Sequence, residues 1–149
     1  MCTGPEFVVI KSLQRRIASI VYEDGLQTRD FVSVHDVVQA NILEMEKRNV
    51  DYNVFNVGTG IPTSIRKVAQ TLFGLYGKSI KPDITRKFRK DDIWHCVADI
   101  SKIKRIGHKP AVSFEKGMGE LSQWSRKEKA VDKFDSANEE LRKRGLSKI

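Results

Sequence analysis

Arg29 is the residue whose type and position in this sequence point most directly to chemistry. It follows a flexible turn at residues 24–25 and precedes a run of strand-forming residues at 31–34. A guanidinium group beside backbone that can approach a ligand closely suits a phosphate better than an apolar core. The stretch therefore predicts an anion-binding loop, and Asp36 is predicted to cap the helix that follows it.

Cysteine and histidine suggest no second chemical site. Cys2 and Cys96 are far apart and lack a CxxC companion, so two free thiols are favoured over a zinc site or a redox pair. His35, His95 and His108 show no metal-ligand spacing and are interpreted as surface or packing residues.

The composition indicates a globular chain with a basic surface. Of 149 residues, 40% are hydrophobic and 31% charged, and Lys plus Arg exceed Asp plus Glu by 27 − 19 = 8. The excess gathers in residues 78–90 and 126–148 without interleaved aromatic residues that would stack bases. A solvated basic face, or attraction for a small anion, is favoured over nucleic-acid binding.

Hydropathy predicts no membrane partner. No apolar run approaches the roughly 20 residues that span a bilayer. Residues 1–20 lack a secretory pattern because Lys11, Arg15 and Arg16 interrupt their apolar positions. The expected compartment is the cytoplasm.

Periodicity and capping residues predict an α/β chain of helices and short strands. The predicted helices are residues 5–19, residues 35–48, a helix capped by Thr63 or Ser64 and closed by Gly77, a short helix from Asp99 or Ser101 to Gly107, and a helix opened by Ser113 whose Phe114, Met118, Leu121 and Trp124 face the core. The predicted extended segments are residues 20–22, 31–34, 53–57, 80–88 and 95–98. Residues 53–57 show little polar alternation, which is typical of a strand buried on both faces in a parallel sheet.

Several short strings carry a family resemblance. They are residues 21–32 with Val34 and Asp36, residues 55–60, residues 89–93, residues 99–102, and residues 107–110 followed by Trp124. Together they resemble the C-terminal half of the extended short-chain dehydrogenase/reductases, the NAD-dependent nucleotide-sugar epimerases and dehydratases. The resemblance covers about residues 4–125 in order. It implies an incomplete Rossmann-like fold that contains the substrate-binding part.

The chain is accordingly divided into two regions. Residues 1–125 are expected to form the nucleotide-sugar-binding region. Residues 126–149 fall beyond the family pattern and are interpreted as a basic C-terminal helix or tail, because a narrow apolar face there ends at Gly145.

Two motifs of the complete enzymes are absent from this sequence. The Gly-rich dinucleotide fingerprint does not occur, since Gly58-Thr59-Gly60 is followed by Ile61-Pro62 and lacks the third glycine. Four residues after the tyrosines at 22, 52 and 76 stand Leu26, Asn56 and Ile80, so no Tyr-x-x-x-Lys pair can be drawn. We therefore assign no catalytic residue and expect this chain alone to bind no NAD.

The resemblance does assign substrate-binding roles. It implies that Arg29 and Arg89 together bind the diphosphate of a nucleotide sugar, and two guanidinium groups can offer bidentate bonds to a pyrophosphate. Gln27 would be a further polar contact. Asp92 would orient Arg89 or meet ribose hydroxyls, and Tyr22 would sit beside the base or serve in packing.

The resemblance also predicts a partner. In the complete enzymes the strand matching residues 53–57 belongs to a large parallel sheet, so alone it would expose backbone edges and apolar faces. We expect either self-association or a separate N-terminal, cofactor-binding half.

Two functional hypotheses follow. The first is the substrate-binding part of an NAD-dependent nucleotide-sugar epimerase or dehydratase, similar to UDP-glucose 4-epimerases and inactive alone. Such enzymes transfer a hydride from the sugar to NAD, act on the resulting ketone and return the hydride. The alternative is a non-catalytic interaction or regulatory protein that keeps the fold.

Overall fold

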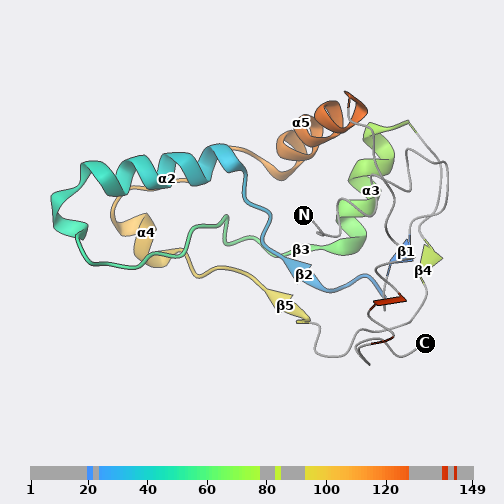
Figure 1. The fold of residues 1–149 in the computed structure, drawn as a ribbon, viewed down its shortest axis with the longest axis horizontal. Helices are drawn as coiled ribbons and strands as arrows, with labels where there is room; N and C mark the ends of the chain where they lie inside the picture. The colour runs from blue at the N-terminus through green and yellow to red at the C-terminus, as the bar shows by residue number, and fades with distance from the viewer. Residues whose placement is uncertain are drawn as a thin grey trace.

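The structure, a computed structural model, describes residues 20–21, 24–77, 83–84, 93–127, 139–140 and 143. The elements in chain order are β1 (Ile20–Val21), β2 (Thr28–Arg29), α2 (Val34–Glu46), the 3-10 turn η1 (Arg48–Val50), β3 (Thr63–Ser64), α3 (Ile65–Leu75), β4 (Asp83–Ile84), β5 (His95–Cys96), α4 (Ser101–Arg105) and α5 (Phe114–Lys127) (Figure 1). The predicted α/β class, with few short strands and several helices, is confirmed. No helix within the described ranges is long and apolar enough to cross a bilayer.

Strand β2 is the centre of a three-stranded sheet in the order β3-β2-β5. It runs antiparallel to β3, with Arg29 opposite Thr63, and parallel to β5, with Arg29 opposite Cys96. Strands β1 and β4 form a separate parallel pair. Arg29 is therefore fixed from both sides, because its strand has a hydrogen-bonded neighbour along each edge.

Helices α3 and α5 pack against each other around one apolar cluster (Figure 1). Its fully buried members from α3 are Val68, Ala69 and Leu72, which recur at helical spacing, and α5 contributes Met118. The Ser64 hydroxyl accepts the Lys67 N–H and so caps α3. This pair of helices holds β3, and through it the sheet, in place.

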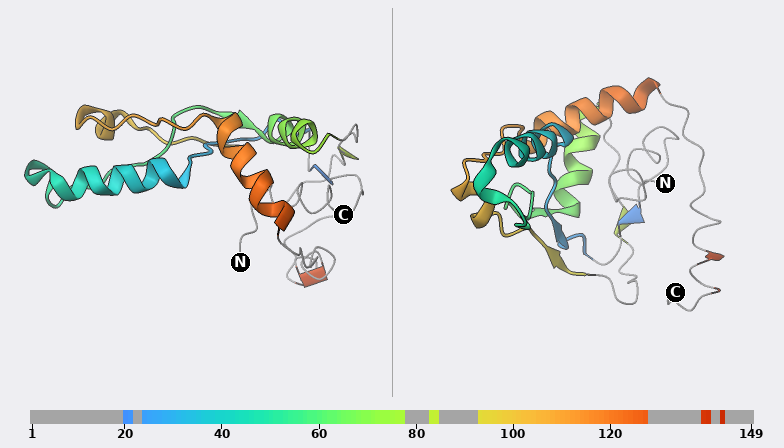
Figure 2. Two further views of the ribbon diagram at one scale, coloured as in Figure 1. Left: turned by 90° about the horizontal axis from the view of Figure 1, so that it is seen from above. Right: turned by 60° about the vertical axis from the view of Figure 1, so that its left-hand side comes forward.

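Helix α2 packs on a second, smaller cluster. Ala40 is fully buried against Ile100 and Ile103, and Phe55 and Val57 lie partly buried beside them. In Figure 2 (left), α2 and the segment that carries α4 run as two separate layers. The clusters are separate, so the α2 end and the α3 end of the molecule each have their own core.

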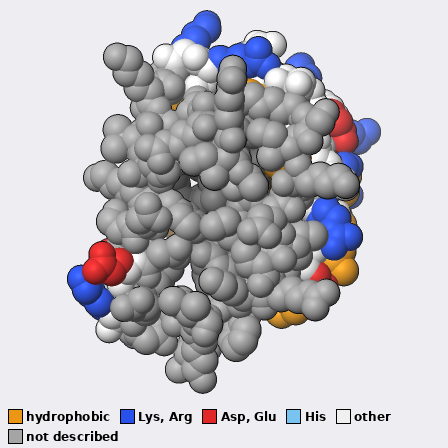
Figure 3. Space-filling view, turned by 90° about the vertical axis from the view of Figure 1, so that its right-hand side faces the viewer, with side chains coloured by type: hydrophobic (Ala, Val, Ile, Leu, Met, Phe, Trp, Pro, Cys, Tyr) orange, Lys and Arg blue, Asp and Glu red, His pale blue; other side chains and the backbone are white. Residues whose placement is uncertain are grey.

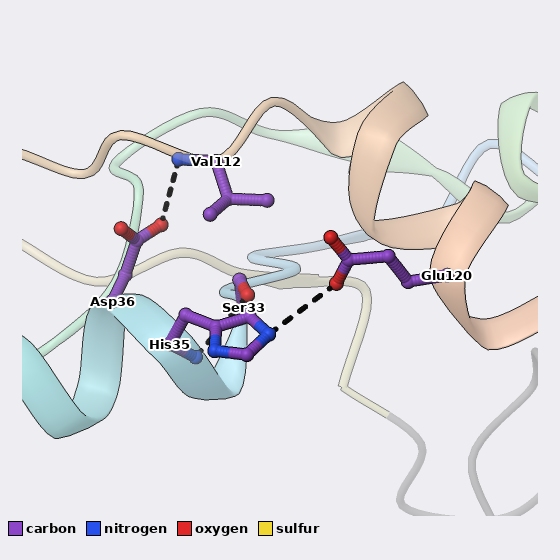
Figure 4. A network of polar contacts seen from close by, with 5 residues as sticks. All are labelled: Ser33, His35, Asp36, Val112 and Glu120. Atoms are coloured by element: carbon purple, nitrogen blue, oxygen red, sulfur yellow. Dashed lines mark hydrogen bonds and ion pairs between the residues drawn. The ribbon is translucent and has the colours of Figure 1, made fainter.

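Asp36 joins these two ends. Its buried carboxylate accepts the N–H groups of Ala111 and Val112 at 2.8 and 3.1 Å, just before α5 begins (Figure 4). Nearby, Nε2 of His35 in α2 lies 3.5 Å from a carboxylate oxygen of Glu120 in α5, and both side chains are well exposed. The exposed pair contributes little to stability, whereas the buried carboxylate fixes the path of the chain into α5.

The opposite side of α2 is apolar and uncovered. Val34, Val38, Ile42 and Met45, here called the α2 stripe, lie on one face of the helix and are 41% to 86% exposed. A surface helix normally turns such a face toward the core. In the α2 end of the described chain, an apolar helix face therefore points to solvent.

A single carboxylate ties the sheet to two other segments. Asp30, directly after Arg29, accepts the Thr59 N–H at 2.8 Å, the Gly60 N–H at 2.9 Å and the Ala98 N–H at 3.3 Å, together with the Thr59 hydroxyl. Partial burial raises the pKa of Asp30, but these hydrogen bonds outweigh it and hold the pKa below the usual 3.8. We call this arrangement the Asp30 latch.

Two predictions around the latch are wrong. The strand expected at residues 31–34 lies earlier, at Thr28–Arg29, because the latch takes the chain out of the sheet at Asp30 and α2 already begins at Val34. Asp36 does not cap α2 either. Ser33 is the cap, since its hydroxyl accepts the His35 N–H, while Asp36 turns inward.

The strand predicted at residues 53–57 is also wrong for the chain as described. The segment has no strand partner in the described ranges, and its side chains alternate, with Phe55 and Val57 partly buried while Val54 and Asn56 are exposed. Trp124, expected in the core, is half-exposed.

The remaining predictions fare better. Helix α2 matches the prediction of 35–48 within two residues, Ser64 caps α3, and Ser113 accepts the Lys116 N–H at the start of α5. Gly77 follows the end of α3 with a φ of 62°, as a helix-ending glycine should. The helix predicted at residues 5–19 lies outside the described residues.

Replacing Asp30 with asparagine should destabilise the fold by about 1–3 kcal/mol at pH 7, because one amide oxygen must replace a carboxylate that several donors share. The folded-state pKa of Asp30 is lowered, so its contribution is complete above 3.8 and is lost as the pH falls through the lowered value. Urea unfolding at pH 7 and pH 3 would measure this. An equal difference in unfolding free energy between wild type and variant at both values would contradict the latch.

Gly58→Ala should likewise destabilise the fold, by about 1–3 kcal/mol. A Cβ at Gly58 would lie 2.5 Å from the Asp30 carboxylate and 2.8 Å from the Ala98 side chain. Gly74→Ala is the matched control, because a Cβ there meets nothing within 4 Å on the exposed side of α3 and should stabilise the helix. Thermal unfolding of both variants would decide, and equal melting temperatures would refute the close contact.

Candidate functional site

Arg29 lies at the middle of the sheet, where β5 joins β2. Its Nη1 donates to the carbonyl oxygen of Thr28 at 2.9 Å and to that of Trp94 at 3.4 Å. The Trp94 carbonyl also accepts the Thr28 N–H at 2.9 Å. The guanidinium group is thus oriented by a carbonyl of β2 and by that of the residue directly before β5.

Of the other four predicted site residues, the structure describes only Gln27. Gln27 is buried, with 4% of its surface exposed, and its carbonyl accepts the Ile65 N–H at the start of α3. Arg89, Asp92 and Tyr22 lie outside the described residues. Gln27 lies two residues before Arg29 in the chain, and the pairing of Arg29 with Arg89 stays a prediction.

The described chain resumes at Ile93, close to Arg29. Residues 95–96 pair with residues 28–29 in parallel register, and the Thr28 hydroxyl bonds to Nδ1 of His95 at 2.8 Å. Sequence reasoning gave His95 no role beyond packing. The parallel pairing that brings His95 to Thr28 joins residues 67 positions apart, so local sequence contained no signal for it.

Asp30 was also missed as a positioning residue. Its place directly after Arg29, between a strand and a Gly-Thr-Gly loop, was a usable signal because a carboxylate readily accepts N–H groups from such a loop. By holding residues 58–60 and Ala98, the latch fixes the backbone on which Arg29 is presented.

The Gly58-Thr59-Gly60 loop does not fit the diphosphate of a dinucleotide. A phosphate cradle needs unoccupied backbone N–H groups, whereas those of Thr59 and Gly60 donate to Asp30. Within the described ranges, no group of three or more His, Cys, Asp or Glu side chains is placed to hold a metal ion.

A cleft of about 550 Å³ lies between the start of α2 and α5. Its lining is mostly apolar and includes Phe31, Phe114 and Leu121, with His35 and Glu120 among its polar residues (Figure 4). Of the predicted site residues that the structure describes, neither Gln27 nor Arg29 lines it. Anion binding at Arg29 stays a prediction, and the cleft is separate from that residue.

The sequence of this chain is similar to known nucleotide-sugar enzymes. Residues 7–121 match the family described as GDP-mannose 4,6 dehydratase. The dTDP-L-rhamnose 4-epimerase of Burkholderia thailandensis is 37% identical over 109 residues, which make up 72% of this chain and 30% of that protein.

Solved structures agree in fold. A UDP-glucose 4-epimerase of Thermotoga maritima, solved with UDP-glucose, is 34% identical with a TM-score of 0.75, and the match covers 83% of this chain and 40% of that one. A UDP-N-acetylglucosamine 4-epimerase of Methanobrevibacter ruminantium, solved with UDP-N-acetylmuramic acid, is 31% identical with a TM-score of 0.72 and covers 80% and 38%.

The chain thus spans about a third of the length of the proteins it matches. The match runs through β2, the Asp30 latch and β5, the segments that present Arg29. The chain therefore belongs to the GDP-mannose 4,6-dehydratase family of NAD-dependent nucleotide-sugar epimerases and dehydratases, and it has the fold of the extended short-chain dehydrogenase/reductases.

Proposed function

We propose that this chain forms the nucleotide-sugar-binding part of an NAD-dependent epimerase or dehydratase and is inactive without a cofactor-binding part. The position of Arg29 supports the proposal. Its guanidinium group is held at the centre of the sheet by carbonyl groups of Thr28 and Trp94. A fixed cation of this planar shape suits the two oxygens of a phosphate.

The relatives support the class of ligand. The Thermotoga and Methanobrevibacter enzymes were solved with UDP-glucose and UDP-N-acetylmuramic acid, both nucleotide-diphosphate sugars. Basic side chains are plentiful on this chain, and Lys and Arg stand out around the rim of the face in Figure 3. We assign the diphosphate to Arg29 and Arg89, with Gln27, Asp92 and Tyr22 as further contacts.

We also propose that a cofactor-binding half covers the α2 stripe. Four exposed apolar side chains along one helix face would each gain about 1 kcal/mol or more on burial. The extended segment at residues 55–57 also supports a cofactor-binding half as the partner. Residues 55–57 make no backbone–backbone hydrogen bond with any described residue, so a strand could be added there.

The remaining length of the relatives indicates what that occupant is. This chain covers 38% to 40% of the length of two relatives that were solved with NAD. Those relatives are therefore about two and a half times as long as the part that matches this chain. A parallel sheet that binds NAD would supply both a strand for residues 55–57 and an apolar face for α2. A second copy of this chain is the competing occupant.

A second candidate function draws on the same stripe. A non-catalytic interaction or regulatory protein would keep the fold and use its uncovered helix face for a partner. It differs from the first candidate in needing no nucleotide sugar. The cytoplasmic location expected from the sequence stays a prediction under both.

Arg29→Ala should abolish the thermal stabilisation that a nucleotide sugar gives. UDP-glucose, dTDP-glucose and GDP-mannose should be tested separately, and at least one should raise the melting temperature of the wild type by binding the folded state. Loss of charge-assisted bonds should weaken binding about tenfold or more, and Arg29→Lys should restore it only in part because lysine lacks the planar fork.

Arg48→Ala, at an exposed position in η1, is the matched control and should respond like the wild type. NAD alone should have no effect. An unchanged nucleotide response in Arg29→Ala would refute the site assignment. Stabilisation by oligonucleotides alone would replace it with nucleic-acid binding.

The purified chain should self-associate in a concentration-dependent way, because its α2 stripe lacks its usual cover. Val38→Glu with Ile42→Glu should weaken association about tenfold or more without lowering the melting temperature. Gln39→Glu, exposed on the same helix, is the control for added charge. Light scattering after gel filtration measures the mass, and a well-folded monomer at high concentration would contradict the docking surface.

A further inference from the structure

Trp94 is an exposed aromatic residue directly beside Arg29. Its side chain is 49% exposed, and it stands directly before β5. An indole buries a large apolar area when it is packed, so leaving half of it in water forgoes stabilisation that the fold could have used. Exposure at this position needs a reason that packing within the described chain does not supply.

The backbone of Trp94 is fixed to the predicted phosphate site. Its carbonyl oxygen accepts both the Thr28 N–H at 2.9 Å and Nη1 of Arg29 at 3.4 Å. The guanidinium group therefore lies against the backbone of the residue that carries the indole. A ligand whose phosphate reaches Arg29 therefore lies beside the backbone of Trp94.

The indole is also braced from one side. The rings of Trp94 and His95 meet edge to face, with centroids 6.1 Å apart and planes at 65°. The imidazole is itself held by the bond from Nδ1 of His95 to the Thr28 hydroxyl at 2.8 Å. This contact limits rotation of the indole, so an exposed ring surface is already oriented before a ligand arrives.

We propose that Trp94 is a stacking platform for a ring of the ligand whose diphosphate Arg29 binds. This proposal rests on the proposed function. It names the residue that would recognise the ring of the ligand, in addition to the residue that binds its diphosphate. A nucleotide-diphosphate sugar carries a flat nucleobase on one side of its phosphates and a pyranose with an apolar face on the other. Both rings can stack on an indole, so the shared chemistry is an uncharged ring tethered to a diphosphate.

The test uses the two tryptophans of the chain. In Trp124→Phe, Trp94 is the only indole and its fluorescence reports on its own surroundings. Titration with UDP-glucose should quench that fluorescence as the base or the pyranose covers the ring, whereas inorganic pyrophosphate should bind with little change. Calorimetry supplies the two affinities independently of fluorescence.

Trp94→Ala, in the otherwise unchanged chain, should weaken UDP or UDP-glucose binding about tenfold or more and leave pyrophosphate binding within about twofold. Trp94→Phe keeps a ring and should recover most of the loss. Equal losses for UDP and UDP-glucose assign the base to the platform. A loss for UDP-glucose alone assigns the pyranose.

The outcomes separate the two proposals. If UDP binds in an Arg29-dependent way but Trp94→Ala leaves its affinity unchanged, the platform is refuted and the proposed function stands. If UDP, UDP-glucose, dTDP-glucose, GDP-mannose and pyrophosphate all fail to bind the wild type, both are refuted. If Trp94→Ala changes self-association but no affinity, Trp94 belongs to a protein interface and the platform is again refuted.

Discussion

The Asp30 carboxylate is the constraint on which the arrangement of this chain depends. Four donors from two distant segments, Thr59-Gly60 and Ala98, converge on one side chain. The residue before it, Arg29, is thereby held in the middle strand, and the residues after it turn directly into α2. A charged group with several N–H donors can do this because charge-assisted hydrogen bonds are about twice as strong as neutral ones. It also explains why a glycine must stand at position 58, where a Cβ would strike the carboxylate.

The latch lies between an end of the molecule with an enclosed apolar core and an end with an exposed apolar helix face. On one side, α3 and α5 enclose a core with fully buried Val68 and Leu72. On the other, α2 rests on a small cluster around Ala40 and Ile103 and turns its α2 stripe outward. The site at Arg29 lies on the sheet between these ends. A partner on the open end would therefore meet the chain close to the place where the proposed ligand binds.

Arg29 and Trp94 are side chains suited to binding a ligand rather than to hydride transfer. The N–H groups of Thr59 and Gly60 donate to Asp30, so this part of the Gly-Thr-Gly loop serves the architecture. Arg29 provides a cation, and Trp94 beside it provides an exposed ring. In the proposed function the cation binds a diphosphate, and in the further inference the indole stacks on an uncharged ring of the same ligand. Neither side chain can accept or donate a hydride, so both proposals concern binding alone.

The sequence by itself determined the family, the α/β class and the helices with strong caps and periodicity, and it predicted Arg29 as a phosphate-binding cation. These depend on local properties: Ser64 and Ser113 cap helices through their own neighbours, and Gly77 ends one with a positive φ. Only the tertiary structure decided that Asp36 turns inward to Ala111 and Val112, that Asp30 ends the strand, and that residues 53–57 have no strand partner in the part of the chain that the structure describes. Each of these rests on contacts between residues dozens of positions apart or on the lack of a neighbouring strand, and such contacts leave no trace in local periodicity.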